Sequence, residues 1–181
     1  MPRINKTQFA LLGCLSIRPM SAYEVKKFMS VSTHYFWMEY EAQLYPTLKK
    51  LEKSHLVKSH EELAEKGGMR NLYEITDKGL DVLREWLIKK TDKMAYRNEF
   101  LLKLFFGDQI DIDTSIHKIK EYQDEATAQL THFQQIEKEV SINKIPKKRQ
   151  PFILATIKYG IHLTKAEIAW CAEMMLLLRE K

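Results

Sequence analysis

The spacing of apolar residues changes twice within the first 90 residues, and no other feature of the sequence restricts the fold as much. The segment at 6–17 is almost wholly apolar and too long for a comfortable strand, which favours a buried helix. Two shorter β-prone segments come later, and Gly67-Gly68 between them indicates a turn. The pattern predicts three helices, a hairpin and a fourth helix, over residues 6–17, 21–31, 43–53, 56–75 and 76 onward.

Polar residues at two of the predicted helix starts support this division. Ser21 is a good N-cap because its hydroxyl can accept a hydrogen bond from a free first-turn N–H, and Glu24 completes a capping-box pattern. Thr76 has the capping role ahead of the fourth helix. Three helices, a hairpin and a helix are the order of a winged helix–turn–helix domain, which we assign to residues 1–92.

The third predicted helix carries the main functional signal. Leu44, Leu48 and Leu51 form one apolar stripe, and Pro46 is tolerated if it lies in the first turn. We expect the helix to present an outward set that suits phosphates and base edges in a DNA major groove, namely Gln43, Tyr45, Thr47, Lys49, Lys50 and Lys53. The alternative is an ordinary surface helix with solvated lysines. Its place as the third helix before a hairpin favours DNA binding, with Lys58, Lys66, Arg70 and Asn71 of the hairpin on the same side.

Residues 93–181 show no strand-like alternation and predict a helical domain. Apolar residues at three- and four-residue steps mark one long helix from Asp113 to about Val140 and another from Phe152 to Leu177. Because two narrow stripes cannot build a large core, we expect these helices to pair with each other and with those of a second subunit. A monomeric hairpin folded back on the first domain is the alternative. The predicted fold is thus mainly α, an N-terminal winged helix–turn–helix with a two-stranded wing followed by a C-terminal long-helix dimerisation domain.

Composition argues against a membrane or secreted protein and leaves nucleic-acid binding open. The net charge is +5, and residues 1–92 hold 15 Lys and Arg against 12 Asp and Glu, while the remainder holds 14 against 12. The basic excess is therefore not concentrated in either half. No apolar run approaches the roughly 20 residues that span a bilayer, and the N-terminus lacks the apolar core of a signal peptide. We expect a cytoplasmic protein with reduced cysteines and no membrane partner.

The sequence contains no recognisable catalytic or metal-binding pattern. Its six histidines lack the pair spacing of zinc sites, and neither a phosphate-binding glycine loop nor a nucleophile motif is present. We therefore expect no enzymatic activity, no bound metal and no cofactor.

The sequence resembles the PadR family of bacterial transcriptional regulators. The likeness rests on residues 10–15, 21–25, 44–52 and 72–79. The most specific part is the Leu-Tyr-Pro-x-Leu-x-x-Leu-Glu block that begins at Leu44. Residues 97–106 resemble the long-tailed branch of the family, which includes phenolic-acid-responsive repressors and a virulence-gene activator.

The resemblance implies a homodimer whose C-terminal helices interlock and hold two winged domains on one face of double-stranded DNA. A two-fold dimer reads two half-sites, so an imperfect palindromic operator is expected. We expect base or groove contacts from Gln43, Tyr45 and Thr47. Phosphate contacts are expected from Lys49, Lys50, Lys53, Lys66 and Arg70.

The function that follows is a repressor of nearby genes that is released by a small aromatic effector. Aromatic residues from both halves could enclose a flat molecule between the domains, and the candidates are Trp37, Tyr40, Tyr96, Tyr159, His162 and Trp170. Core or dimer packing is the alternative for each aromatic residue, and a lone buried histidine is the alternative for His162. The other function considered is a protein-binding adaptor, or an activator, that uses the winged-helix surface without a ligand.

Overall fold

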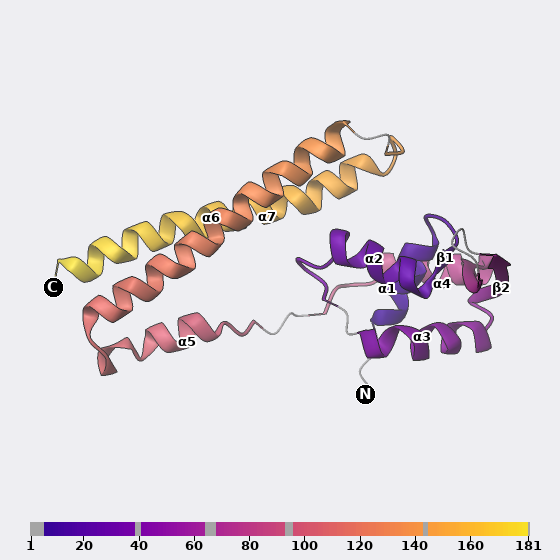
Figure 1. Cartoon of the computed structure of the whole chain (residues 1–181), viewed down its shortest axis with the longest axis horizontal. Coiled ribbons are helices and arrows are strands. Elements are labelled where there is room, and N and C mark those ends of the chain that lie inside the picture. The colour runs from indigo at the N-terminus through magenta and orange to yellow at the C-terminus, as the bar shows by residue number, and fades with distance from the viewer. Residues whose placement is uncertain (1–5, 39–40, 64–67, 93–95, 143–144, 181) are drawn as a thin grey trace. The chain divides into compact units, whose positions relative to one another are not determined.

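The computed structural model describes residues 6–38, 41–63, 68–92, 96–142 and 145–180. The chain divides into two compact units, Met1–Lys93 and Met94–Lys181, and each is described by itself (Figure 1). Within the described residues, no helix is both long enough and apolar enough to cross a membrane.

The first unit has the predicted order of helices and strands. It consists of α1 (Thr7–Leu15), α2 (Ala22–Ser32), α3 (Glu41–Lys53), the hairpin of β2 (Val57–Leu63) and β3 (Met69–Ile75), and α4 (Asp77–Ile88). A third strand, β1 (Met20–Ser21), was not predicted; it pairs with β3 and gives an antiparallel sheet in the order β1-β3-β2. Two residues are too few to show alternation, so periodicity in the sequence does not reveal β1.

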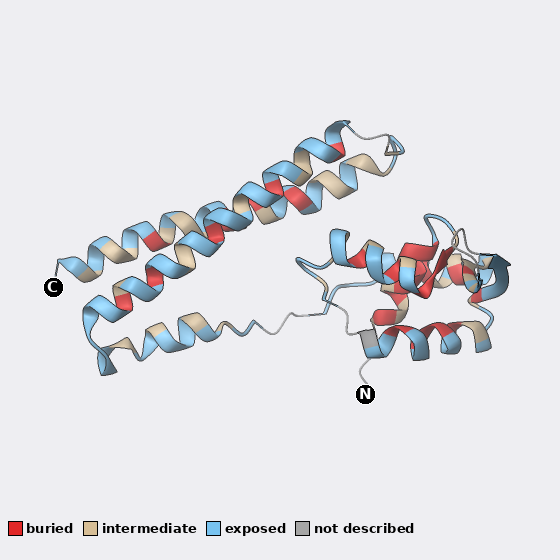
Figure 2. Cartoon of the chain, viewed as in Figure 1, coloured by how far each residue is buried: buried red, intermediate tan, exposed pale blue. Residues whose placement is uncertain are grey.

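One hydrophobic core holds this unit together (Figure 2). Leu11 of α1, Val25 of α2 and Leu48 of α3 are fully buried within it. The Phe9 ring stacks on Trp86, with ring centroids 4.6 Å apart, and this contact joins α1 to α4. Each fully buried aliphatic side chain contributes about 1.5–3 kcal/mol, so burial of its leucines is enough to anchor α3.

Local hydrogen bonds set the helix starts as predicted. The Ser21 hydroxyl accepts from the Glu24 N–H at 3.2 Å, and the Glu24 carboxylate accepts from the Ser21 N–H at 2.8 Å, which completes the capping box. Thr76 caps α4 by accepting from the Gly79 N–H at 3.1 Å. Pro46 departs from the prediction because α3 already begins at Glu41, so the proline lies inside the helix rather than in its first turn.

The second unit is a helical hairpin preceded by a short helix. It comprises α5 (Glu99–Phe105), the 3-10 turn η1 (Gly107–Gln109), α6 (Ile112–Ile142) and α7 (Gln150–Arg179). The two long helices lie side by side (Figure 1). Phe133 of α6 packs against Gly160 of α7 so closely that a Cβ at Gly160 would lie 2.9 Å from the ring.

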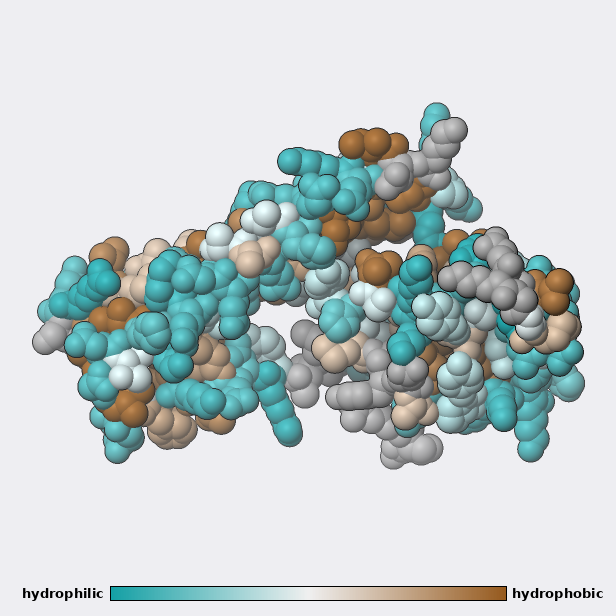
Figure 3. Space-filling view, viewed as in Figure 1, coloured by the Kyte–Doolittle hydropathy of each residue, from teal (hydrophilic) through white to brown (hydrophobic). Residues whose placement is uncertain are grey.

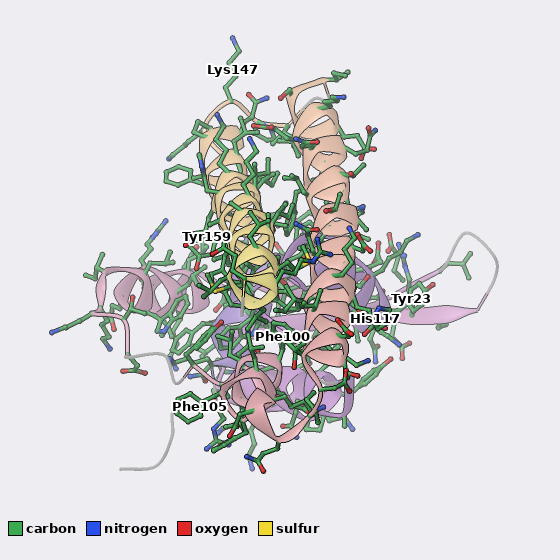
Figure 4. All side chains as sticks on the ribbon, turned by 90° about the vertical axis from the view of Figure 1, so that its left-hand side faces the viewer. Tyr23, Phe100, Phe105, His117, Lys147 and Tyr159 are labelled. Atoms are coloured by element: carbon green, nitrogen blue, oxygen red, sulfur yellow. The ribbon has the colours of Figure 1, made fainter. Side chains whose placement is uncertain are left out.

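The first part of the apolar stripe that the sequence indicates on α7 does not face α6. Phe152, Tyr159 and Leu163 remain 73%, 63% and 48% exposed, and Figure 4 shows Tyr159 pointing away from α6. Ile157 and Ile161 pack against α6 instead. The helix thus has two apolar faces, and the described residues of the unit cover the one that carries Ile157 and Ile161. Figure 3 shows hydrophobic patches among the hydrophilic surface of the helices.

Candidate nucleic-acid interface

Helix α3 buries one side and presents a polar, cationic surface on the other. Leu44, Leu48 and Leu51 are buried as predicted. The outward residues are Gln43, Tyr45, Lys49, Lys50 and Lys53, and Tyr45 is 53% exposed. In the part of the chain that the structure describes, none of the three lysines forms an ion pair with a carboxylate. Their charges are therefore available to an external anion.

Thr47 is a correction to the predicted outward set. It is only 5% exposed, so its hydroxyl is not presented to DNA in this structure. The reason is its position three residues after Leu44 and four before Leu51, which places it on the same side of the helix as the leucine stripe. The apolar stripe is wider than the leucines alone indicate.

Side-chain contacts fasten α3 to the hairpin. The Ser59 hydroxyl of β2 donates a short hydrogen bond to the Glu52 carboxylate of α3. Tyr73 of β3 is buried, and burial, followed by the nearby Glu52 carboxylate and Tyr45, raises the pKa of its phenol. These contacts were not predicted, because no sequence pattern links residues on a helix to residues on a later hairpin.

The hairpin presents a mixture of charges rather than a basic surface. Asn71 is exposed, and Lys66 lies outside the described residues. The Lys58 ammonium pairs with Glu74 at 3.0 Å. Arg70 is half-buried, and its guanidinium lies 2.9 Å from the carboxylate of Glu62. Unlike the lysines of α3, these two cations are already neutralised by the hairpin's own carboxylates.

The predicted effector residues are distributed over both units. Trp37 packs against the core of the first unit, and Tyr40 lies outside the described residues. In the second unit Tyr96, Tyr159 and His162 are exposed, so the alternative of a buried histidine is wrong. A pocket shared by residues of the two units remains a prediction.

Trp170 belongs to an aromatic cluster that the sequence analysis did not identify. Phe100 of α5 stacks on Tyr122 of α6 at 4.3 Å and meets Trp170 of α7 edge-on at 6.2 Å (Figure 4 labels Phe100). The Tyr122 hydroxyl donates to Glu167 at 3.1 Å, and burial, then the Glu167 charge, raises the Tyr122 pKa. Tyr122 lies three residues after Ile119 and four before Ala126, so it belongs to the apolar side of α6, but its spacing does not show that it meets Phe100.

Comparison with known proteins relates both units to one group of regulators. Residues 11–85 match the transcriptional regulator PadR-like family, and residues 96–179 match the family described as virulence activator alpha C-term. The negative transcriptional regulator PadR of Bacillus subtilis (strain 168) is 25% identical over 162 residues, which cover 88% of this chain and 86% of that protein.

Solved structures show the same fold over nearly the whole chain. The crystal structure of Bacillus subtilis PadR in complex with operator DNA superposes with a TM-score of 0.85 at 20% identity, covering 95% of this chain and 98% of that one. The same protein in complex with p-coumaric acid gives 0.82 at 19% identity, with both chains covered completely. The Vibrio cholerae virulence activator AphA gives 0.72 at 26% identity, covering 96% of this chain and 98% of the activator. With a PadR-like domain followed by a virulence-activator C-terminal domain, this chain belongs to the PadR family of transcriptional regulators.

Proposed function

We propose that this chain is a homodimeric, sequence-specific DNA-binding repressor of nearby genes that is released by a small aromatic effector. The observation that carries the proposal is the outward surface of α3, where three lysines without an ion-pair partner among the described residues lie beside the exposed Gln43 and Tyr45. Ammonium groups hold phosphates, and an amide and a phenol can hydrogen-bond to base edges in the major groove. We assign base or groove contacts to Gln43 and Tyr45, and phosphate contacts to Lys49, Lys50 and Lys53.

The matched structures support both ligand classes. A protein of this fold has been crystallised with operator DNA and, separately, with p-coumaric acid. The protein-adaptor function lacks comparable support. A surface that carries three lysines and few apolar side chains suits a polyanion better than a protein partner.

The exposed face of α7 supports the homodimer. Phe152, Tyr159 and Leu163 lie on one side of the helix and are left exposed by the described residues of the second unit. Burying such a stripe against a second copy removes apolar surface from water, which favours association. A two-fold dimer presents two α3 helices, so it requires two half-sites in an imperfect palindrome.

A binding assay with the chain's own upstream DNA tests the regulator. The full chain is titrated against that fragment and against a shuffled fragment of the same length and base composition, at several salt concentrations. We expect tight binding to the upstream fragment and footprints of two related half-sites. Equal affinity for both fragments at every salt concentration contradicts sequence-specific regulation.

The effector part of the proposal has its own assay. Preformed complexes of protein and DNA are titrated with p-coumaric acid and a panel of other aromatic acids. Aliphatic acids of equal charge serve as controls. We expect at least one aromatic acid to release the DNA, and W37F or W170F to weaken that release while leaving DNA affinity unchanged. If no member of the panel releases the DNA, the effector part of the proposal is contradicted, and the DNA-binding part is unaffected.

A further inference from the structure

The outer part of the β2–β3 hairpin has little hydrophobic anchorage. Only the first residue of β2, Val57, is buried, and the following residues through Leu63 are exposed. An isolated two-stranded hairpin is marginal in water, so its direction depends on side-chain contacts with the rest of the unit. Because the hairpin is the wing of this fold, its direction decides where Asn71 meets DNA.

Arg70 supplies such a contact from the central strand of the sheet. Its Nε and Nη2 donate to the same carboxylate oxygen of Glu62, at 3.3 and 2.9 Å, and Glu62 is its direct cross-strand partner on β2. On the other side, Arg70 Nη1 lies 3.5 Å from Glu24 Oε2 in the first turn of α2. One guanidinium therefore connects the wing to the helix that precedes α3.

The second carboxylate is itself held in place. Glu24 accepts from the Ser21 N–H at 2.8 Å and from Arg18 Nη1 at 3.1 Å. Burial alone would raise the pKa of Glu24, but the Ser21 hydrogen bonds and the Arg18 charge outweigh it, and the pKa is lowered. Glu24 is thus a fixed anion at neutral pH, anchored to β1 and to the start of α2.

The described part of this network contains as many cations as anions. Two arginines, Arg18 and Arg70, face two carboxylates, Glu24 and Glu62. A phosphate at Arg70 would compete with both carboxylates for its guanidinium, whereas the lysines of α3 have no such partner among the described residues. Its carboxylate partners therefore distinguish Arg70 from the α3 lysines, to which phosphate contacts are assigned.

We propose that Arg70 is a positioning residue that sets the direction of the wing by bridging Glu62 and Glu24, and that it does not contact phosphate. This differs from the phosphate contact that was predicted for Arg70 from the sequence. The bridge needs a fork of N–H donors, because one side chain must reach two carboxylates in different directions, and lysine cannot provide that geometry. The proposal rests on the proposed DNA-binding function.

Binding measured over a range of salt concentrations distinguishes the two roles. A positioning role predicts that R70Q weakens operator binding by about tenfold and leaves the slope of log affinity against log salt unchanged, since no phosphate contact is lost. R70K should bind as weakly as R70Q, because it keeps the charge but loses the fork. A phosphate role predicts the opposite, a slope reduced by about 1 in R70Q and near-normal binding in R70K.

The carboxylates provide a second, independent comparison. E62Q should weaken binding under the proposal, whereas it should strengthen binding if Glu62 merely competes with DNA for Arg70. The matched control is E61Q, which removes the same charge from the neighbouring exposed position on β2, opposite Asn71. E24Q is also measured. It removes the charge that faces Arg70, whereas its glutamine can still complete the capping box.

Hydrogen exchange in the absence of DNA tests the bridge itself. Backbone amides of residues 57–63 and 69–75 should exchange faster in R70Q, R70K and E62Q than in the wild type or E61Q, while the amides of α1 keep their protection. Wild-type exchange rates in all three variants overturn the proposal, as does a reduced salt slope in R70Q. If the wild type binds no DNA, the proposed function fails, and the exchange data still decide whether Arg70 holds the wing.

Discussion

Lys50 lies on the exposed surface of α3 with its ammonium group unpaired in the described chain, so its charge is available to a phosphate. We expect K50A to weaken binding to all DNA sequences alike and to reduce the salt slope by about 1, because one phosphate contact is lost. Affinities for operator and shuffled DNA at several salt concentrations provide the measurement. K58A is the matched control, since that lysine already pairs with Glu74. An altered sequence preference with an unchanged slope contradicts the phosphate role.

Gly79 has no room for a side chain, although it lies in a helix where alanine is normally preferred. A Cβ there would lie 2.1 Å from the carbonyl oxygen of Leu56. We expect G79A to lower the free energy of unfolding by about 1–3 kcal/mol, because backbone atoms must move. The control is G13A in α1, where nothing lies within 4 Å and alanine should add up to about 1 kcal/mol. Urea denaturation measures both, and equal effects of the two substitutions contradict the steric argument.

Single residues show where sequence reasoning succeeds and where it stops. The burial of Leu44, Leu48 and Leu51 was predictable, since periodicity directly reports one face of a helix. Thr47 was placed on the wrong side because its polarity outweighed its position in the stripe. The contacts of Arg70 were not predictable, because Glu62 is placed opposite it by the register of the hairpin and Glu24 is brought near by the pairing of β1 with β3.

At the scale of elements, local chemistry predicted the helix starts, and pairing between distant segments was missed. The capping box of α2 and the Thr76 cap of α4 follow from residues three positions apart. Strand β1 exists only because Met20 and Ser21 pair with β3, some 50 residues later. The second apolar face of α7 has a similar explanation, since Ile157 and Ile161 are recognisable as core only against α6.

The capping box also makes the stability of the first unit dependent on pH. The pKa of Glu24 is lowered in the folded protein, so its ionised form adds stability above its ordinary pKa of 4.5, and this contribution is lost as the pH falls through the folded value. We expect the difference in unfolding free energy between wild type and E24Q to be constant near neutral pH and to shrink below about pH 4.5. Urea denaturation at a series of pH values measures it. A difference that does not vary with pH contradicts the assignment.

At the scale of the whole molecule, the proposed division of labour assigns DNA contact to one unit and association to the other. The first unit buries its leucines in a closed core and leaves cations outside, whereas α7 leaves apolar side chains outside. Mean composition hides this difference, since the two halves carry nearly equal net charge. The placement of charged and apolar residues on particular helix faces, rather than their number, supports the two roles.

A substitution at Leu163 tests whether association through the second unit supports DNA binding by the first. Leu163 lies on the exposed apolar face of α7 and not against α6. We expect L163E to convert the dimer to a monomer, since a carboxylate buried without a partner is strongly unfavourable. Loss of the second half-site contact should then weaken binding to the full operator by about 100-fold, while affinity for a single half-site is unchanged. Light scattering and DNA titration measure the two effects, and circular dichroism checks that the helices remain. K165E adds a carboxylate to the same helix outside the stripe and should remain dimeric. An L163E protein that is still dimeric and binds the full operator normally would show that this face is not the dimer interface.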